Sequence, residues 1–390
     1  MNFNNTKIAF SMKSNGDLRN ALLLYTIIQR PFVVKLAKVM ANTAMAIRFP
    51  IAWAVKPTLY RQFVGGESLQ ECSKLANLLK EYNVKSVLDY SAEGGSSQEH
   101  INNAFKETMR SIEFAKGDLS IPYTVFKPTA MVNDALLNKA AKAFDSLSQQ
   151  EREEIEKFRE RVLALCQKAY ESNVRILIDA EHYATQDLID KVAEEAMERY
   201  NSKRAIVFQT LQMYRVDRLD YLKKIHKEAQ EKNYIPGIKF VRGAYMEEER
   251  ELAVKNGYLD PIHPTKEATD NCYDSGLKYV MEHIDSFELF SGTHNYNSNI
   301  LLAKLIEEKG IKKDDQRIFF SQLYGMSDNI TFTLAEAGFN VCKYVPYAPV
   351  KEVLPYLIRR AEENTSMAGQ TSRELQLIKS EIVRRRKTRS

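Results

Sequence analysis

Short apolar runs alternate with amphipathic helical segments along most of the chain. At residues 81–90, 171–180 and 338–347 a helical pattern stops at Asn and a β-branched run follows at once. Asn and Gly readily adopt the left-handed conformation that ends a helix, so the residues that follow turn back as a strand. The runs are continuously apolar, which is typical of parallel strands covered on both faces.

Eight such runs are present, and helical patterns separate all of them. They are Ser86–Tyr90, Tyr123–Lys127, Arg175–Asp179, Ala205–Gln209, Ile238–Arg242, Glu288–Thr293, Arg317–Gln322 and Val341–Tyr344. Eight strands alternating with helices predict an α/β fold, a (β/α)8 barrel of the TIM type. The stretch of about residues 130–172 is too long for a bare loop, and its pattern predicts a helical insertion between strands 2 and 3.

Residues 1–66 differ from the rest of the chain in charge and pattern. They carry nine Lys or Arg residues against one acid, Asp17, whereas the remainder is slightly acidic. Pro31, Pro50 and Pro57 divide this segment into short helical pieces. We therefore predict a basic helical arm over residues 1–66 and a barrel over residues 67–390. Because the positive charge belongs to one end, the sequence does not indicate a nucleic-acid-binding protein.

The arm contains the most apolar part of the chain, but no segment of it is predicted to span a membrane. The stretch from Pro31 to Val55 is interrupted by Lys35, Lys38 and Arg48, and the first twenty residues show no secretory signal. Trp53, the only tryptophan, and several Leu and Phe residues lie beside these bases. This mixture suits a lipid interface. The expected location is cytoplasmic, peripheral on the inner face of a membrane; packing of the arm on the barrel is the alternative.

Polar side chains follow the apolar residues at the end of every predicted strand. They are Asp89, Lys127, Asp179 with Glu181 just beyond, Gln209, Arg242, Thr293 with His294, Gln322 and Tyr344. In a (β/α)8 barrel the carboxyl ends of the strands converge on one face and form the active site. One polar residue at the end of a strand could simply point into solvent and have no function. Polar residues at the ends of all eight strands favour an active site.

A second candidate lies in the helical pattern Lys351–Thr365, after the last strand. Tyr356, Arg359 and Arg360 are spaced i, i+3 and i+4 and therefore share one helix face. Two adjacent guanidinium groups can clamp a carboxylate, which Lys cannot reproduce. A solvated basic face paired with Glu362 and Glu363 is an equally good interpretation of the spacing. The sequence contains no GxGxxG, P-loop, GxSxG or HxxxH motif.

Several ordered segments resemble the proline dehydrogenase family. They are GIKFVRGAYMEEER (237–250), DPIHPTKEATDNCYD (260–274), SGTHN (291–295) and YVPYAPVKEVLPYLIRRAEEN (344–364). VFQTLQMY (207–214) and FSQLYGM (320–326) bring the chain closer to the stand-alone mitochondrial type than to the bifunctional bacterial type. The resemblance runs from about Phe63 to the C-terminus, and residues 1–62 resemble the family only loosely.

The resemblance implies a distorted (β/α)8 barrel that holds FAD and oxidises L-proline to Δ1-pyrroline-5-carboxylate. Hydride would pass from proline C5 to flavin N5, and a membrane quinone would take the electrons; no metal is implied. By position, the catalytic and substrate-binding residues would be Lys127, Asp179, Leu323, Tyr344, Tyr356, Arg359 and Arg360. The FAD-binding residues would be Gln209, Lys239, Val241, Gly243, Ala244, Tyr245, Thr293, His294 and Glu363.

Three other functions stay open. A hydroxyproline dehydrogenase would share the flavin site, but in that branch the position of Tyr344 is typically smaller, so Tyr344 favours proline. A Schiff-base aldolase would use Lys127 as its nucleophile and would need no flavin. A non-catalytic, membrane-associated barrel would not need the polar strand ends. Flavin absorbance of the purified protein separates the first function from the other two.

Overall fold

The computed structural model describes residues 2–47, 51–92, 95, 97–366 and 368–388. Eight strands pair in chain order and close into a barrel. The pair of β1 with β8 and the pairs from β2 to β7 are parallel. The strands are β1 (Lys85–Tyr90), β2 (Tyr123–Phe126), β3 (Arg175–Ile178), β4 (Val207–Gln212), β5 (Gly237–Val241), β6 (Glu288–Gly292), β7 (Ile318–Leu323) and β8 (Val341–Tyr347). The predicted α/β barrel is confirmed.

The chain divides into two compact units, Met1–Gly94 with Gln322–Ser390, and Gly95–Ser321. The helices of the first unit are α1 (Thr6–Ala9), α2 (Asn15–Ile28), α3 (Pro31–Ala46), α4 (Ala52–Val55), α5 (Arg61–Phe63), α6 (Leu69–Lys80), α15 (Asp328–Glu336), α16 (Val350–Ser366) and α17 (Ala368–Lys387), with a π-helical turn η1 (Lys56–Tyr60). The boundary predicted at residue 66 stays a prediction.

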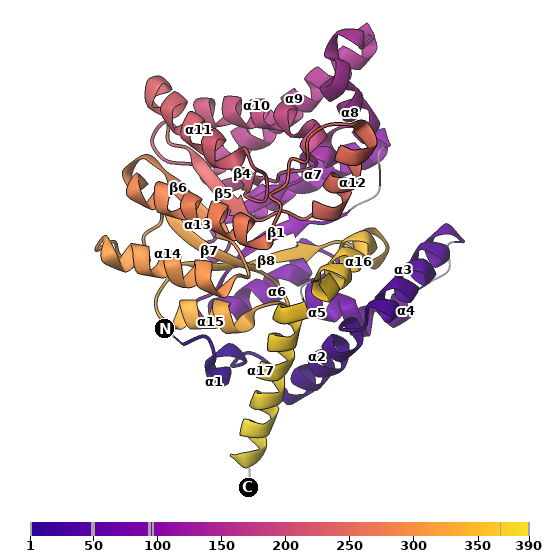
Figure 1. Ribbon diagram of the computed structural model, residues 1–390, viewed down its shortest axis with the longest axis vertical. Coiled ribbons are helices and arrows are strands. Elements are labelled where there is room, and N and C mark those ends of the chain that lie inside the picture. Colours follow the sequence, from indigo (N-terminus) through magenta and orange to yellow (C-terminus); the bar gives the residue numbers. More distant parts are fainter. Residues whose placement is uncertain (1, 48–50, 93–94, 96, 367, 389–390) are drawn as a thin grey trace. The chain divides into compact units, whose positions relative to one another are not determined.

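The second unit contains the other helices. They are α7 (Gln98–Ala115), α8 (Asp134–Ala143), α9 (Gln149–Ser172), α10 (Tyr183–Tyr200), α11 (Arg218–Lys232), α12 (Met246–Asn256), α13 (Lys266–Glu282) and α14 (Tyr296–Glu308), with 3₁₀ turns η2 (Pro128–Met131), η3 (Phe144–Ser146) and η4 (Ile284–Ser286). Helices α8 and α9 lie between β2 and β3 in the chain. Helices α13 and α14 run side by side on the outside of this unit (Figure 1).

Left-handed residues end several helices just before a strand. Asn83, Asn173 and Asn233 have φ values of 57°, 56° and 56° and follow α6, α9 and α11. Before β8 this position is taken by Gly338, with φ of 88°, and not by Asn340, at which the sequence pattern placed the stop. Glycine has no Cβ and carries no penalty in this conformation. Each stop turns the chain directly into the next strand.

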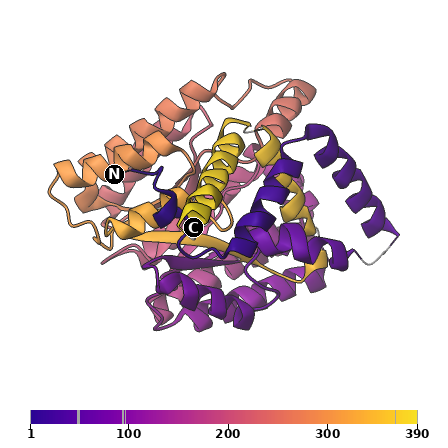
Figure 2. The same cartoon turned by 90° about the horizontal axis from the view of Figure 1, so that it is seen from below.

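The arm packs on the C-terminal helices of its own unit. Leu18, Ala21 and Tyr25 of α2 share an apolar cluster with Leu375 and Ile378 of α17, and the two helices run side by side in both views (Figure 2). A second cluster joins the arm to α16; its members include Ile28, Val34, Tyr60, Phe63, Val353, Tyr356 and Leu357. Pro31 begins α3 and Pro57 lies in η1, whereas Pro50 lies outside the described residues.

The opposite face of the arm is exposed and apolar. Phe32 and Leu36 of α3 are 77% and 49% exposed, and Trp53 of α4 is 74% exposed. Val39 and Met40 continue the same stripe along α3. No helix in the described part of the chain is long and apolar enough to cross a membrane.

Aromatic and charged side chains close the amino-terminal end of the strands in the second unit. The Tyr123 ring packs edge-on against Phe208, Phe290 and Phe319, with ring centroids 4.8–5.3 Å apart. The Arg175 guanidinium pairs with Glu288 at 2.9 Å, and both side chains are buried. This end is filled by packed rings and a buried ion pair, so we expect the chemistry at the carboxyl ends of the strands.

β7 ends one residue beyond its predicted end, at Leu323, and two other strands extend further. β4 continues past Gln209 to Gln212, because Thr210, Leu211 and Gln212 pair with residues of β5. β8 continues past Tyr344 to Tyr347, which pairs with Tyr90 of β1. The prediction that Gln209 and Tyr344 end their strands is therefore wrong.

Candidate active site

A buried ion pair lies at the carboxyl ends of β3 and β5. Asp179 directly follows β3, and its carboxylate accepts a hydrogen bond from the Lys239 ammonium on β5. The Lys239 side chain is 6% exposed. A buried ammonium is tolerated only when it is paired, and Asp179 fulfils this condition. The proposed role of Asp179 in holding the arginine pair stays a prediction, as does the role of Lys127, which directly follows β2.

Glu181 is a buried carboxyl group next to this pair. Its Oε1 accepts a hydrogen bond from Thr129 Oγ1 at 2.7 Å, and its Oε2 accepts one from the Tyr245 hydroxyl at 3.2 Å. Burial raises the pKa of Glu181, and the hydrogen bond from Thr129 and the charge of Lys127 oppose this effect. The sequence pattern placed Glu181 beyond the strand end without a role. Its burial and its contact with Tyr245 make it part of the site.

Arg242 orders the strand-end residues of β6. Its Nη1 donates to Thr293 Oγ1 at 2.6 Å, and its Nε donates to Asp270 Oδ1 at 2.7 Å. The guanidinium lies 4.5 Å from the centroid of the Tyr273 ring. The charge of Arg242 is therefore balanced by Asp270, and the Thr293 hydroxyl is held in one orientation. His294, the next residue, is half-buried.

Gln209 contacts the helix layer and does not lie at the strand end. Its Nε2 donates to Asp190 Oδ1 on α10 at 2.7 Å and to the Tyr221 hydroxyl on α11 at 2.8 Å. These contacts fix its side chain on the outer side of β4. Gln209 Oε1, Thr210 Oγ1 and Gln212 Oε1 are all buried and have no hydrogen-bond partner among the described residues.

Gly243 is required by its conformation and by its neighbour. Its φ is 138°, and a Cβ at this position would lie 2.5 Å from carbons of the Tyr214 ring. Any other residue would be strained and would collide with this ring. Val241 ends β5 half-buried, Ala244 is exposed, and the Tyr245 ring lies 4.2 Å from that of His182.

The arginine helix α16 belongs to the first unit. Arg360 and Tyr356 are 8% and 4% exposed, and the guanidinium lies 5.1 Å from the centroid of the Tyr356 ring. Arg360 Nη2 donates to Glu363 Oε1 at 2.5 Å. Burial raises the pKa of Glu363, and Arg360 and Arg359 oppose this effect. Arg360 thus pairs with Glu363, as expected if this helix face were a solvated basic surface. Because the Arg360 side chain is buried, however, the face is not solvated at this residue.

The apolar residues predicted to face the substrate lie in the same unit. Leu323 packs against the cluster that contains Tyr356. Tyr344 is buried, and its carbonyl accepts a hydrogen bond from the backbone N–H of Tyr324 at 2.9 Å. Tyr347, at the true end of β8, is also buried, with its ring 5.5 Å from that of Tyr90. Tyr347, which ends β8, is therefore an additional candidate for an apolar contact with the substrate.

A comparison with protein families identifies the chain. The family model described as proline dehydrogenase matches residues 72–373, which is more than half of the sequence. The chain belongs to the proline dehydrogenase family. The family resemblance of the motifs is thereby confirmed.

Curated relatives of this proline dehydrogenase family member differ in name. The carbapenem antibiotics biosynthesis protein CarD of Pectobacterium carotovorum is 32% identical over 83% of each chain. Proline dehydrogenase 2 of Arabidopsis thaliana, a mitochondrial protein, is 41% identical over 62% of this chain and 52% of its own length. Hydroxyproline dehydrogenase of Xenopus laevis is 29% identical over 96% of this chain and 88% of its own.

A solved structure has the same fold. Proline utilization A (PutA) from Bdellovibrio bacteriovorus, inactivated by N-propargylglycine, superposes with a TM-score of 0.72 at 20% sequence identity. The match covers 92% of this chain and 38% of that protein, so the chain spans well under half of its length. At this identity the likeness shows the fold alone.

Proposed function

We propose that the chain is an FAD-dependent proline dehydrogenase, an oxidoreductase that converts L-proline to Δ1-pyrroline-5-carboxylate. The observation that carries this proposal is the buried arrangement of Tyr356 and Arg360 on α16, with Arg359 beside them. Proline is a small zwitterion with an apolar ring, so its site needs a cationic clamp and an apolar wall. Burial strengthens the clamp, because an ion pair is stronger away from water.

The residues at the carboxyl ends of β4 and β5 fit a flavin. Buried polar atoms seldom lack a hydrogen-bond partner. Gln212 Oε1 and Thr210 Oγ1 are buried and have none among the described residues, so a bound ligand could supply one. The pyrimidine edge of a flavin carries both donors and acceptors that suit them, and the buried Lys239 ammonium suits the negative charge of the reduced ring. When bound, FAD supplies the hydride acceptor. We therefore add Gln212 to the proposed FAD set, which also includes Gln209.

The other proposed FAD residues are those that the family resemblance implies. They are Lys239, Val241, Gly243, Ala244, Tyr245, Thr293, His294 and Glu363. The Arg242 hydrogen bond already orients the Thr293 hydroxyl, and Glu181 orients the Tyr245 hydroxyl. Because these hydroxyl groups are already held in place, less conformational entropy is lost when a ligand binds to them. This favours binding of a ligand in one defined position.

The protein's part in the reaction is positioning. Arg359 and Arg360 would hold the proline carboxylate, and Tyr344, Tyr356 and Leu323 would pack on the ring. Holding C5 in one orientation removes much of the entropic cost of reaction, and exclusion of water protects the imine product from premature hydrolysis. Lys127 and Asp179 would maintain the charge pattern around the substrate.

We further propose a membrane quinone as the electron acceptor and the arm as a peripheral contact with lipid. The stripe of Phe32, Leu36, Val39 and Met40 on α3 is exposed, and Trp53 lies on α4. Aromatic and aliphatic side chains beside Lys and Arg bind the interface of anionic bilayers. Packing of the arm on α16 and α17 uses its other face, so both interactions are compatible.

Anaerobic addition of L-proline to the purified full-length protein tests the proposal. We expect a flavin absorbance spectrum that bleaches on addition of proline. Trans-4-hydroxy-L-proline should bleach it more slowly; a faster reaction would favour the second candidate, hydroxyproline dehydrogenase, which the Xenopus relative suggests. A colourless protein that does not bind added FAD would contradict both dehydrogenase functions. Trapping of a carbonyl substrate on Lys127 with borohydride would favour an aldolase.

A further inference from the structure

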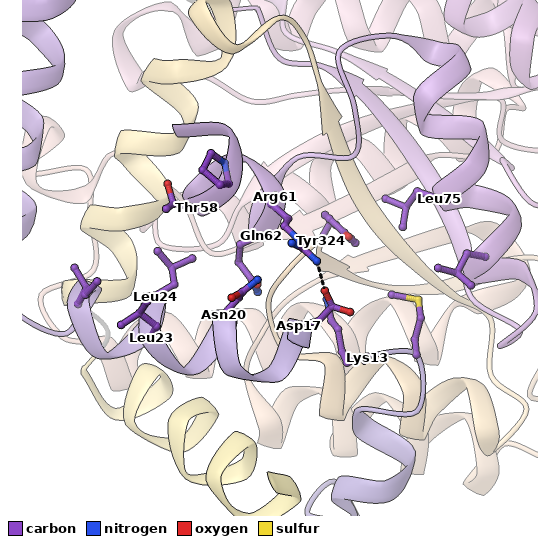
Figure 3. Close-up of a pocket in the computed structure, with 14 residues that line it drawn as sticks. Lys13, Asp17, Asn20, Leu23, Leu24, Thr58, Arg61, Gln62, Leu75 and Tyr324 are labelled. Carbon is purple, nitrogen blue, oxygen red and sulfur yellow. Dashed lines mark hydrogen bonds and ion pairs between the residues drawn. The ribbon is translucent and has the colours of Figure 1, made fainter. Parts of the chain in front are cut away.

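A cavity of about 210 Å³ lies within the first unit, between the arm and the rest of that unit. Its lining comes from Met12 and Lys13, from α2, from residues 57–62, from α6 and from Tyr324, which directly follows β7. In Figure 3 the side chains of Asn20, Arg61 and Gln62 lie in the middle, with Leu23 and Leu24 on one side and Leu75 on the other. We call this the arm cavity. No residue assigned to proline or FAD lines it.

The size and the lining of the arm cavity restrict its ligand. Pockets for drug-sized ligands have volumes of ~300–1,000 Å³, so this cavity suits a single ring with small substituents. Asn20, Arg61 and Tyr324 carry N–H or O–H donors, whereas the leucines present only methyl groups. A planar ring with carbonyl acceptors at its edge matches this lining.

Charge in the arm cavity argues against an anionic ligand. Arg61 Nη2 lies 2.7 Å from Asp17 Oδ1, and Lys13 Nζ lies 3.8 Å from Asp328 Oδ2. Each cation of the lining therefore already faces a carboxylate. A phosphate would have to compete with these carboxylates, so the lining favours a neutral molecule over a lipid head group.

The opening of the arm cavity is apolar. Leu23 and Ile27, one turn apart on α2, line the cavity and are also 64% and 43% exposed. The next helix, α3, continues with exposed Phe32 and Leu36. A hydrocarbon tail that leaves the cavity would therefore run along the apolar stripe that we propose to contact lipid.

The inner wall of the arm cavity is connected to the substrate side of the barrel. The N–H of Tyr324, a lining residue, donates to the carbonyl of Tyr344 at 2.9 Å. Leu323, directly before Tyr324, packs with Tyr356 in one apolar cluster. The cavity and the proposed proline site thus share one stretch of backbone.

We propose that the arm cavity binds the head group of a neutral quinone, with its tail leaving past Leu23 and Ile27. This inference rests on the proposed function, which requires a lipid-soluble acceptor. It adds a separate site for that acceptor, so that proline and quinone do not compete for one position.

Photolabelling tests the site without relying on turnover. Full-length protein is irradiated with an aryl-azide derivative of a short-tailed benzoquinone, and labelled peptides are mapped by mass spectrometry. We expect labels within residues 12–27, 57–62 and 75–78. Label in other peptides alone, or competition by glycerol phosphate but not by unlabelled quinone, would overturn the proposal.

A filling variant and a matched control sharpen the test. Asn20→Trp places a large ring in the cavity, whereas Thr26→Trp adds the same ring to exposed α2 surface that does not line it. Asn20→Trp should abolish the label and raise the KM for the quinone about tenfold or more, equivalent to at least ~1.4 kcal/mol. Thr26→Trp should change neither. A parental KM in Asn20→Trp would overturn the site.

The proline half-reaction separates this inference from the proposed function. Anaerobic bleaching of the flavin by proline should be unchanged in Asn20→Trp and Thr26→Trp. If the parent protein itself is not bleached, the proposed function fails, whatever the labels show. If it is bleached and reoxidised by quinone but the label lies outside the arm cavity, only the site fails.

Discussion

Arg360 donates a 2.5 Å hydrogen bond to Glu363, one helical turn further along α16, and its guanidinium lies over the ring of Tyr356. These two contacts fix the plane of the guanidinium. Its Nε is buried and has no hydrogen-bond partner among the described residues. Arg360 is thus held in one orientation with a donor still available, which suits recognition of a planar carboxylate.

We expect Arg359→Lys and Arg360→Lys each to weaken proline binding strongly. Lys keeps the charge but loses the planar fork, and each charged hydrogen bond left unmade costs ~1.5–3 kcal/mol. Titration of flavin bleaching with proline measures the apparent Kd. FAD content should be largely retained. Arg110→Lys, a change at an exposed arginine of α7, is the control, and parental affinity in both α16 variants would exclude the clamp.

A second prediction concerns the aromatic wall of the substrate site. If Tyr344 packs on the proline ring, Tyr344→Ser should lower the rate with proline and raise the relative rate with hydroxyproline. Tyr347→Ser tests the residue that in fact ends β8. Loss of an apolar contact shifts discrimination by ~1–3 kcal/mol, so a modest change is expected. The ratio of kcat/KM for the two substrates assigns the role to one tyrosine, and a parental ratio in both variants argues against either.

Gln209→Leu and Gln212→Leu should have different effects. Gln209 donates to Asp190 and Tyr221, so its replacement removes two hydrogen bonds between β4 and the helix layer and should lower the free energy of unfolding by ~1–3 kcal/mol. Gln212 has a buried oxygen without a described partner, so its loss should reduce flavin affinity with little effect on the apoprotein. Urea unfolding and the ratio of flavin to protein absorbance measure the two effects, and flavin loss in Gln209→Leu alone would assign the flavin contact to Gln209 and not to Gln212.

These two glutamines illustrate what the sequence pattern can and cannot predict. Apolar runs predicted the barrel correctly, because buried parallel strands need continuous apolar residues. A polar residue was taken to end each run. Gln209 breaks this rule because Asp190 and Tyr221, on the helices before and after β4 in the chain, accept hydrogen bonds from its amide nitrogen. Pairing with β5 shows where β4 really ends, at Gln212.

The ion pairs of the site could not be predicted from spacing. Lys239 lies 60 residues from Asp179 in the chain, yet their side chains are hydrogen-bonded. Arg242 pairs with Asp270, which lies 28 residues further along the chain. Such pairs depend on which strand ends and helix starts the barrel brings together. The helix face of Tyr356 and Arg360, in contrast, follows from local periodicity and was predictable.

Stability should decrease between pH 5 and pH 8 because of Glu374 on α17. Burial and, to a smaller extent, the nearby charge of Asp328 raise the pKa of Glu374 to about 7, although the charges of Lys343 and Lys13 oppose this effect. A carboxyl group with a raised pKa contributes stability that is complete below ~4.3, its value in the unfolded chain, and is lost as the pH rises through 7. The expected loss is ~2–4 kcal/mol, measured by urea unfolding at several pH values.

Glu374→Gln removes this titration. The variant should unfold with a flatter pH profile and should be more stable than the parent at pH 8, because no buried carboxylate then faces Asp328. Glu231→Gln, at an exposed position of α11, controls for the general loss of a negative charge. The same steep profile in Glu374→Gln as in the parent would show that another group causes the pH dependence.

Substitutions in the exposed apolar stripe of α3 test the membrane contact better than removal of the arm does. Truncation near Phe63 would expose the buried partners of Tyr25 and Ile28, so loss of binding would be ambiguous. The double variant Phe32→Asp and Leu36→Asp changes only exposed side chains. It should reduce co-sedimentation with anionic liposomes at least tenfold, since burial of each large apolar side chain contributes ~1.5–3 kcal/mol.

A matched double variant, Val254→Asp and Leu259→Asp, carries the same charge change on exposed apolar residues outside the arm. It should bind liposomes like the parent protein. High salt should weaken binding of the parent, because the bases of the arm are screened from the anionic surface. If the parent stays in the supernatant at low salt, or if both double variants lose binding equally, the stripe on α3 does not serve as a membrane contact.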